Sequence, residues 1–102
     1  MVIAGIAQAG EIEYRKPSAG DKGSYVLLEM KKEGNIVKAL HRRVGPSGTG
    51  YTRTESNCAT RQMREIGYSE EGPLNIKPTP TKWFDLVTGS SKSDLFNFVC
   101  LK

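Results

Sequence analysis

The chain has 102 residues, a hydrophobic fraction of 37% and a net charge of +4, from 15 Lys and Arg against 11 Asp and Glu. This length supports one domain with a small core, and no stretch approaches the roughly 20 apolar residues that a membrane-spanning helix needs. The basic residues are spread along the chain, so the charge permits an acidic protein, an anionic surface or nucleic acid as partner without choosing among them.

The first nine residues, MVIAGIAQA, resemble the end of an export signal, because an apolar stretch is followed by small residues that suit cleavage after Ala9. No Lys or Arg precedes the apolar stretch. Residues 1–9 are therefore expected to be the remnant of a signal peptide, with a disordered N-terminus or a first strand as the alternatives. Residues 10–102 are predicted to form a single small α+β domain.

The cysteines are Cys58 and Cys100. In an oxidising compartment an even cysteine count in a short chain favours one disulfide, whereas in the cytosol two unrelated buried thiols would be expected. A bridge between them would stabilise so small a domain by about 4 kcal/mol through the entropy of loop closure.

The middle of the chain reads as short strands. Residues 11–14 alternate polar and apolar side chains, and residues 17–23 have the composition of a loop. A core strand is predicted over 24–30, and the apolar side chains expected on one of its faces are Val26, Leu28 and Met30.

A hairpin is predicted next. Residues 31–35 supply turn residues, with Gly34 or Asn35 able to take a positive φ, and the return strand covers 36–44 with Ile36, Leu40 and Val44 at even spacing. A helix over 36–43 is the alternative, since the same residues also suit a helical stripe.

Residues 45–50 are rich in glycine but lack the Lys-Ser/Thr pair of a phosphate-binding loop, so they are interpreted as a hairpin loop. Residues 51–56 and 59–68 are expected to form two strands, or one long bent strand. The prolines in 69–82 predict an irregular connection over the surface, and 83–87 a short edge strand or turn.

The clearest helix lies at the C-terminal end. Ser91 with Asp94 three residues later approximates a capping box. One side of the predicted helix carries Leu95, Phe96, Val99 and Cys100. The predicted fold is therefore α+β: an antiparallel sheet of about four to six strands with a C-terminal helix packed on it, tied to the sheet by Cys58 and Cys100.

A candidate binding surface is formed by basic residues, which compete with a solvated polar sheet face as the interpretation: Lys38, Arg42, Arg43, Arg53, Arg61 and Arg64. Binding of nucleic acid would need exposed aromatic rings beside basic side chains. Tyr51 beside Arg53, or Tyr68 beside Arg61 and Arg64, could supply this arrangement. Tyrosines packed at the sheet margins are the favoured reading, so nucleic acid is not the expected partner.

Catalytic chemistry finds little support in the sequence. His41 is the only histidine, and together with Cys58 and Cys100 it shows none of the short paired spacings of zinc sites. We expect a solvated strand histidine, solvated carboxylates at Glu70 and Glu71, and no metal, cofactor or catalytic residue.

The C-terminal half resembles the surface-adhesin protein E type of small bacterial envelope protein. The resemblance rests on the order of a cysteine that begins an Arg-containing strand, a Tyr and a Gly, a Trp, and a Gly-Ser-led helix ending in Val-Cys: Cys58, Arg61, Arg64, Tyr68, Gly72, Trp83, Ser90, Val99 and Cys100. It implies an antiparallel sheet with a disulfide-tied C-terminal helix, export through a signal peptide and an adhesive role. It carries over no ligand-contact residues.

The function expected is that of an exported, periplasmic or cell-surface interaction protein that resembles adhesins and has no catalytic activity. Its partner would be a protein or an anionic surface, and two copies could pair through sheet edges as a homodimer. The alternatives are a small basic β-domain that binds single-stranded nucleic acid and a periplasmic enzyme inhibitor.

Overall fold

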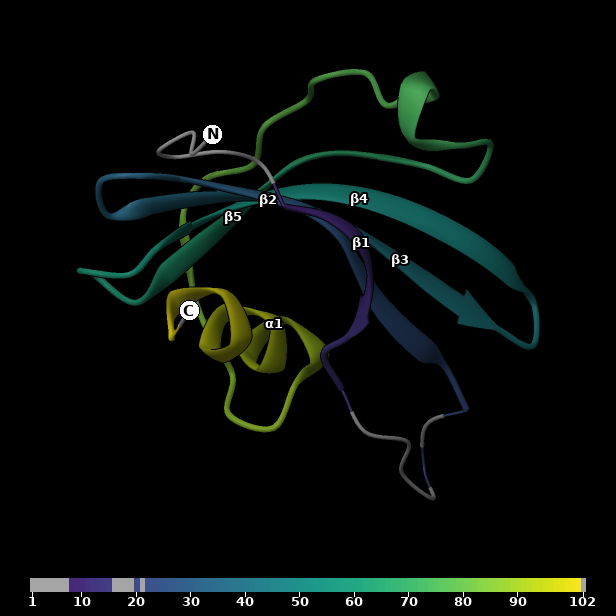
Figure 1. Ribbon diagram of the computed structural model, residues 1–102, viewed down its shortest axis with the longest axis horizontal. Helices are drawn as coiled ribbons and strands as arrows, with labels where there is room; N and C mark the ends of the chain where they lie inside the picture. The colour runs from purple at the N-terminus through teal and green to yellow at the C-terminus, as the bar shows by residue number, and fades with distance from the viewer. Residues whose placement is uncertain (1–7, 16–19, 21, 102) are drawn as a thin grey trace, which may run out of the picture.

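The computed structural model describes residues 8–15, 20 and 22–101, and it has the predicted α+β architecture (Figure 1). Six strands form one sheet in the order of the chain, and every neighbouring pair is antiparallel. The elements are β1 (Gln8–Glu13), β2 (Ser24–Glu33), β3 (Ile36–Gly45), β4 (Gly48–Asn57), β5 (Gln62–Ser69), the 3₁₀ turn η1 (Pro73–Asn75), β6 (Phe84–Asp85) and α1 (Ser91–Cys100).

The sheet curves around α1, so that its inner face encloses the helix and its outer face points away from it (Figure 1). The pairing register shifts between Ala9 and Ile12 in β1, between Leu27 and Glu29 in β2, and between Arg53 and Thr54 in β4. Such bulges bend a strand and increase its twist. They account for a sheet that curls over one short helix.

The hydrophobic core lies between the inner face and α1. Leu95, Phe96 and Val99 of the helix are buried, as the predicted stripe requires. They pack in one cluster with inner-face side chains of the sheet, which are Leu27, Met30, Val37, Ala39 and Met63. Because a ten-residue helix is marginal in isolation, this burial is what holds α1 in place.

The predicted apolar face of β2 is wrong. Leu27 and Met30 belong to the core cluster, whereas Val26 and Leu28 do not. The bulge at Leu28 is the reason: an extra residue in the strand exchanges the two faces, so alternation cannot be followed through it.

The disulfide prediction is confirmed: Cys58 and Cys100 are bonded, with their Cα atoms 5.7 Å apart. Cys58 directly follows β4, and its N–H donates to the Asn35 carbonyl at 2.8 Å, which joins two neighbouring turns. Cys100 is the last residue of α1. The bond therefore ties the end of the helix to the turn end of the sheet.

The helix begins one residue from where the sequence placed its cap. Ser90, and not Ser91, is the N-cap, and its Oγ accepts a hydrogen bond from the Ser93 N–H at 3.1 Å. Both serines satisfy the sequence preference for a hydroxyl at this position. The extended backbone of Ser90 decides between them.

The hairpin over β2 and β3 is confirmed, with Gly34 at φ 63° in its turn. Residues 51–56 and 62–68 lie in the separate strands β4 and β5, not in one bent strand. The connection after β5 is irregular as expected, and it lies along that strand: the N–H of Thr79 donates to Ile66 and that of Thr81 to Glu65.

Strand β1 begins at Gln8, before the domain start expected at residue 10, because Gln8 and Ala9 pair with Met30 and Glu29 of β2. The rest of the proposed signal remnant, residues 1–7, lies outside the described residues, as does most of the loop expected at 17–23. Within the described part of the chain, no helix has the length and apolar character required to cross a membrane.

Candidate functional site

Four of the six basic residues singled out from the sequence share one face of the sheet, and the other two lie elsewhere. Lys38, Arg42, Arg53 and Arg64 lie on the outer face, because β3, β4 and β5 pair so that these positions alternate with the inner-face ones. Arg43 lies on the inner face. Arg61 lies in the turn between β4 and β5, at φ 61°, with its guanidinium 5.2 Å from the Phe96 ring centre.

Carboxylates neutralise most of the outer-face bases. The nearest nitrogen–oxygen distances are 3.1 Å for Lys38 and Glu33, 2.8 Å for Arg42 and Glu11, and 2.8 Å for Arg64 and Glu55. Hydrogen bonds from these cations lower the pKa of Glu11 and of Glu33 below the ordinary value.

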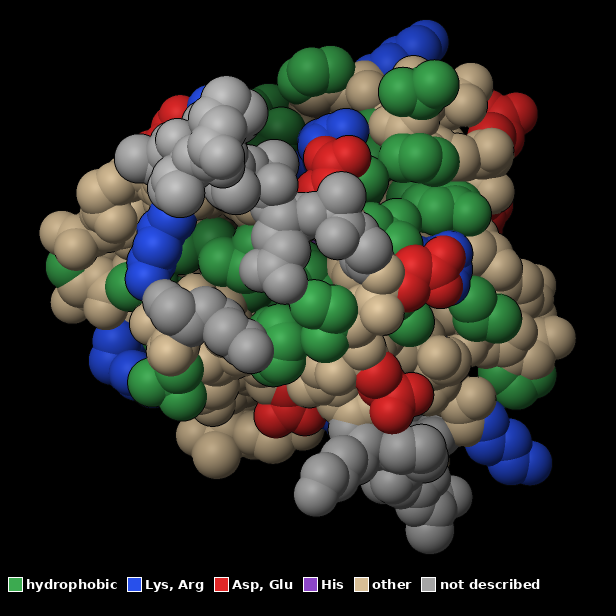
Figure 2. All heavy atoms as spheres, in the orientation of Figure 1, with side chains coloured by type: hydrophobic (Ala, Val, Ile, Leu, Met, Phe, Trp, Pro, Cys, Tyr) green, Lys and Arg blue, Asp and Glu red, His purple; other side chains and the backbone are tan. Residues whose placement is uncertain are grey.

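Acidic and basic side chains are interspersed on the visible face in Figure 2. Of the four outer-face basic residues, Arg53 is the one without a carboxylate partner among the described residues. The arrangement matches a solvated polar face more closely than a surface dedicated to anions.

Of the two aromatic–basic sets considered for nucleic acid, the fold keeps one together and divides the other. Tyr51 shares the outer face with Arg53, but Tyr68 lies on the inner face opposite Thr52. Arg64 stacks at 4.9 Å on the ring of Trp83 instead of standing beside Tyr68. The set of Tyr68 with Arg61 and Arg64 is therefore not formed.

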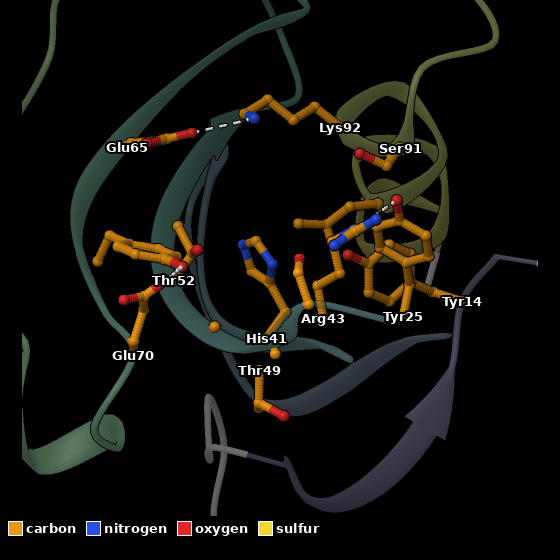
Figure 3. Close-up of a pocket in the computed structure, with 15 residues that line it drawn as sticks. Tyr14, Tyr25, His41, Arg43, Thr49, Thr52, Glu65, Glu70, Ser91 and Lys92 are labelled. Atoms are coloured by element: carbon orange, nitrogen blue, oxygen red, sulfur yellow. Dashed lines mark hydrogen bonds and ion pairs between the residues drawn. The ribbon is translucent and has the colours of Figure 1, made fainter. Parts of the chain in front are cut away.

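A pocket of about 280 Å³ opens where the inner face meets the first turn of α1 (Figure 3). The turn between β3 and β4 borders it, and side chains from β2, β3, β4, β5 and α1 line it. We call it the inner pocket, and the residues used below are Tyr14, Tyr25, His41, Arg43, Thr49, Gly50, Thr52, Glu65, Tyr68, Glu70, Ser91 and Lys92.

His41 is not the solvated histidine expected from the sequence. It faces the inner pocket, is only 9% exposed, and makes no side-chain hydrogen bond among the described residues, its Nε2 included. Burial, and to a smaller extent the nearby Lys92 ammonium, lower the pKa of His41 to about 3. The imidazole is therefore neutral at physiological pH.

The charges that line the pocket balance. Lys92 and Arg43 are matched by Glu65 and Glu70. Lys92 Nζ lies 3.0 Å from Glu65 Oε2, and these side chains meet across the pocket in Figure 3. Arg43 Nε donates to the Tyr25 hydroxyl at 3.0 Å. With a neutral histidine, the lining is polar without a net charge.

Hydroxyl groups supply the remaining polarity. Thr49, Thr52 and Ser91 line the pocket, and their hydroxyls have no hydrogen-bond partner within the part of the chain that the structure describes. They are only partly exposed. Such hydroxyls are both donors and acceptors, so they are available to a ligand that carries groups of the same kind.

The rim of the pocket is formed by Tyr68. Its side chain is 53% exposed, and its hydroxyl donates to Glu70 Oε2 at 3.4 Å. The ring lies close over the backbone of β4, because a Cβ added to Gly50 would stand 2.6 Å from the Tyr68 Cε1 atom. An aromatic ring that is half exposed at the edge of a polar pocket is available for stacking.

Tyr14 and Tyr25 form the opposite wall, with ring centres 6.0 Å apart in an edge-to-face arrangement. Arg15 holds this wall against the helix: its Nη1 lies 2.9 Å from Asp94 Oδ2 and donates to the Gly89 carbonyl at 3.2 Å. Burial is the main cause that raises the pKa of the Tyr14 hydroxyl above its ordinary value. The Tyr14 hydroxyl of this wall is therefore uncharged at physiological pH.

Metal-binding clusters and free thiols are absent from the described residues. No group of three or more His, Cys, Asp or Glu side chains with a metal-binding arrangement occurs among them. Both thiols are consumed in the disulfide. What the inner pocket offers chemically is hydrogen bonding and ring stacking.

Among the residues that line the inner pocket, the sequence singled out Arg43 as a binding residue and Tyr68 as a ring for stacking, but it did not predict the pocket itself. The one available signal was the even spacing of Val37, Ala39 and His41, which places the histidine on the same strand face as two core residues. Lys92 and Tyr14 lie far from this strand in the sequence: the packing of α1 brings Lys92 to it, and the pairing of β1 with β2 brings Tyr14. No protein-family model, curated protein or solved structure matches the chain, so the resemblance to the surface-adhesin protein E type stays a prediction.

Proposed function

We propose that this protein is an exported binding module, periplasmic or on the cell surface, that resembles adhesins in its role and has no catalytic activity. The observation that carries the proposal is the inner pocket itself, a polar, charge-balanced cavity held open between a curved sheet and a helix that a disulfide ties in place. A preformed cavity binds without having to order its walls first.

Two features favour binding over catalysis. His41 is buried, neutral and without a hydrogen-bonded nucleophile or carboxylate among the described residues. A general base needs such a hydrogen-bonded partner or substrate and a pKa near the working pH. The carboxylates of the pocket are already paired with Lys92 and Tyr68.

Export is supported by the disulfide, because such bonds form and persist in oxidising compartments and are rare in the cytosol. The partner proposed is a protein or surface ligand that enters the inner pocket. Pairing of two copies through sheet edges stays a prediction that light scattering would check.

The test is cell fractionation of the producing organism combined with thiol counting on the denatured, unreduced protein. We expect the protein in the envelope fraction with no reactive thiol. Recovery from the cytosol with two reactive thiols would overturn the proposal, and sequencing the mature N-terminus would locate any cleavage site.

A further inference from the structure

We propose that the inner pocket binds an uncharged saccharide, with one sugar ring stacked on Tyr68 and its hydroxyl groups bonded to the pocket wall. The inference rests on the proposed binding function and adds the chemical class of the ligand. The pocket volume of about 280 Å³ lies just below the range of about 300–1,000 Å³ typical of small-molecule sites, so the pocket suits one sugar ring and not a larger ligand.

The charge balance argues against an anion. Lys92 is already engaged with Glu65, and Glu70 stands at the rim beside Tyr68. An entering anion would have to compete for the ammonium and pass a carboxylate. A neutral ligand meets neither obstacle, because the lining contains as many carboxylates as cations.

The polarity of the wall argues against an apolar ligand. Covering the hydroxyls of Thr49, Thr52 and Ser91 without replacing their hydrogen bonds to water would cost free energy. Each hydroxyl of a saccharide both donates and accepts, as do these side chains, while Glu65 and Lys92 add an acceptor and a donor next to them.

The ring of Tyr68 supplies the apolar surface on which a sugar ring can stack. A sugar ring presents polarised C–H groups on one face, and these pack on the negative face of an aromatic ring. Tyr68 is the half-exposed ring at the pocket mouth and is supported from behind by the bare backbone of Gly50. The more enclosed Tyr14 and Tyr25 rings form the wall opposite.

The test is a titration of the oxidised full chain followed by ¹H–¹⁵N NMR, with lactose and N,N′-diacetylchitobiose as neutral saccharides, one typical of animal glycans and the other of bacterial cell-wall sugars. We expect saturable shifts with at least one of them at the amides of Gly48, Thr49, Gly50, Ser91 and Lys92. Which sugar binds more tightly distinguishes the two sources of ligand.

Variants test the stacking step. Tyr68→Ala is expected to weaken saccharide binding about tenfold, whereas Tyr68→Phe keeps the ring and most of the affinity. Tyr51→Ala, on the outer face, is the matched control and should leave binding unchanged. Gly50→Ala should weaken binding because its methyl group displaces the Tyr68 ring.

Inorganic phosphate and glucuronate form the anionic arm of the titration. Saturable binding of phosphate in the pocket, or no saturable shift with either neutral saccharide at tens of millimolar, would overturn the saccharide assignment. Shifts confined to the outer face would overturn it as well. None of these results would disturb an envelope location with oxidised cysteines, whereas a cytosolic, reduced protein would overturn the proposed function independently.

Discussion

Lys92 of α1 and Glu65 of β5 form an ion pair of 3.0 Å that joins the first turn of the helix to the sheet across the inner pocket. Both side chains are partly exposed, so we expect the pair to contribute at most about 1 kcal/mol to folding. The Lys92 ammonium also lowers the pKa of the His41 imidazole, as the second cause after burial.

The first prediction concerns the protonation of His41. Because it is the only histidine, its ring protons can be followed individually by NMR as the pH is lowered. The native protein should show no histidine titration near pH 6.5, since burial first and Lys92 second lower the pKa to about 3. Lys92→Met should raise the midpoint, whereas Lys82→Met, in the exposed connection before β6, should not.

A midpoint close to the ordinary histidine value in the unaltered protein would contradict the burial of His41. The groups that face this ring come from several elements: Tyr14 beyond β1, Thr52 and Glu65 from β4 and β5, and Lys92 from α1. The carboxylate among them, Glu65, is paired with Lys92 and makes no hydrogen bond to His41, so it does not stabilise a charged imidazolium in that way.

The second prediction is a loss of stability in mild acid. Between pH 6.5 and about 3 the unfolded chain binds a proton at His41 that the folded chain does not, so the free energy of unfolding falls as the pH falls. The slope from this residue approaches about 1.4 kcal/mol per pH unit. The contribution is fully present above pH 6.5.

Urea unfolding at a series of pH values measures this slope. In His41→Gln the slope over the same pH range should become shallower, even if the overall stability is lower. The part of the acid-induced loss that is due to Glu11 and Glu33 should persist, because protonating carboxylates whose pKa is lowered in the folded state also destabilises that state. An unchanged slope would show that His41 is protonated in the folded protein.

The third prediction concerns the disulfide, which closes a loop of 42 residues. Cys58→Ala combined with Cys100→Ala should lower the free energy of unfolding by about 4 kcal/mol and the melting temperature by about 15–30 °C. The β signal in circular dichroism should survive at low temperature, because the strands pair without help from the bond.

The order of events provides the control for that experiment. Amides of α1 should lose protection from hydrogen exchange before those of β3 and β4, since the bond holds the last turn of the helix. Loss of the whole β signal in the double variant would show instead that the disulfide organises the sheet itself.

The fourth prediction concerns the start of α1. Ser90→Ala removes the acceptor of the Ser93 N–H and should cost about 1 kcal/mol. Ser93→Ala is the matched control, since it removes a hydroxyl from the same turn but keeps the N–H. Equal losses in the two variants, measured by urea unfolding, would place the cap elsewhere.

Local signals in the sequence were sufficient for the elements of the fold. Gly34 predicted a turn between two strands, and the spacing of Leu95, Phe96 and Val99 predicted a helix with one buried side. The small even number of cysteines predicted the bond to that helix. The turn and the helix depend on residues close in sequence, and two cysteines allow only one pairing within the chain.

The arrangement of the site required the tertiary structure. The bulge at Leu28 exchanged the faces of β2, and no side-chain pattern announces where an extra residue will be accommodated. The partners of the basic residues also come from elsewhere in the chain: Arg42 meets Glu11 of β1, and Arg64 meets Glu55 of β4. A candidate anion surface thereby became a neutralised one.

The sequence by itself thus determined the antiparallel strands, the C-terminal helix and its disulfide, because backbone preferences and apolar periodicity act over a few residues. Only the tertiary structure decided that His41 is buried and that Lys92, Tyr68 and Tyr14 meet around it. The physical reason is that a pocket depends on the register of several strands and on the docking of a helix, and these are set by packing between residues far apart in the chain.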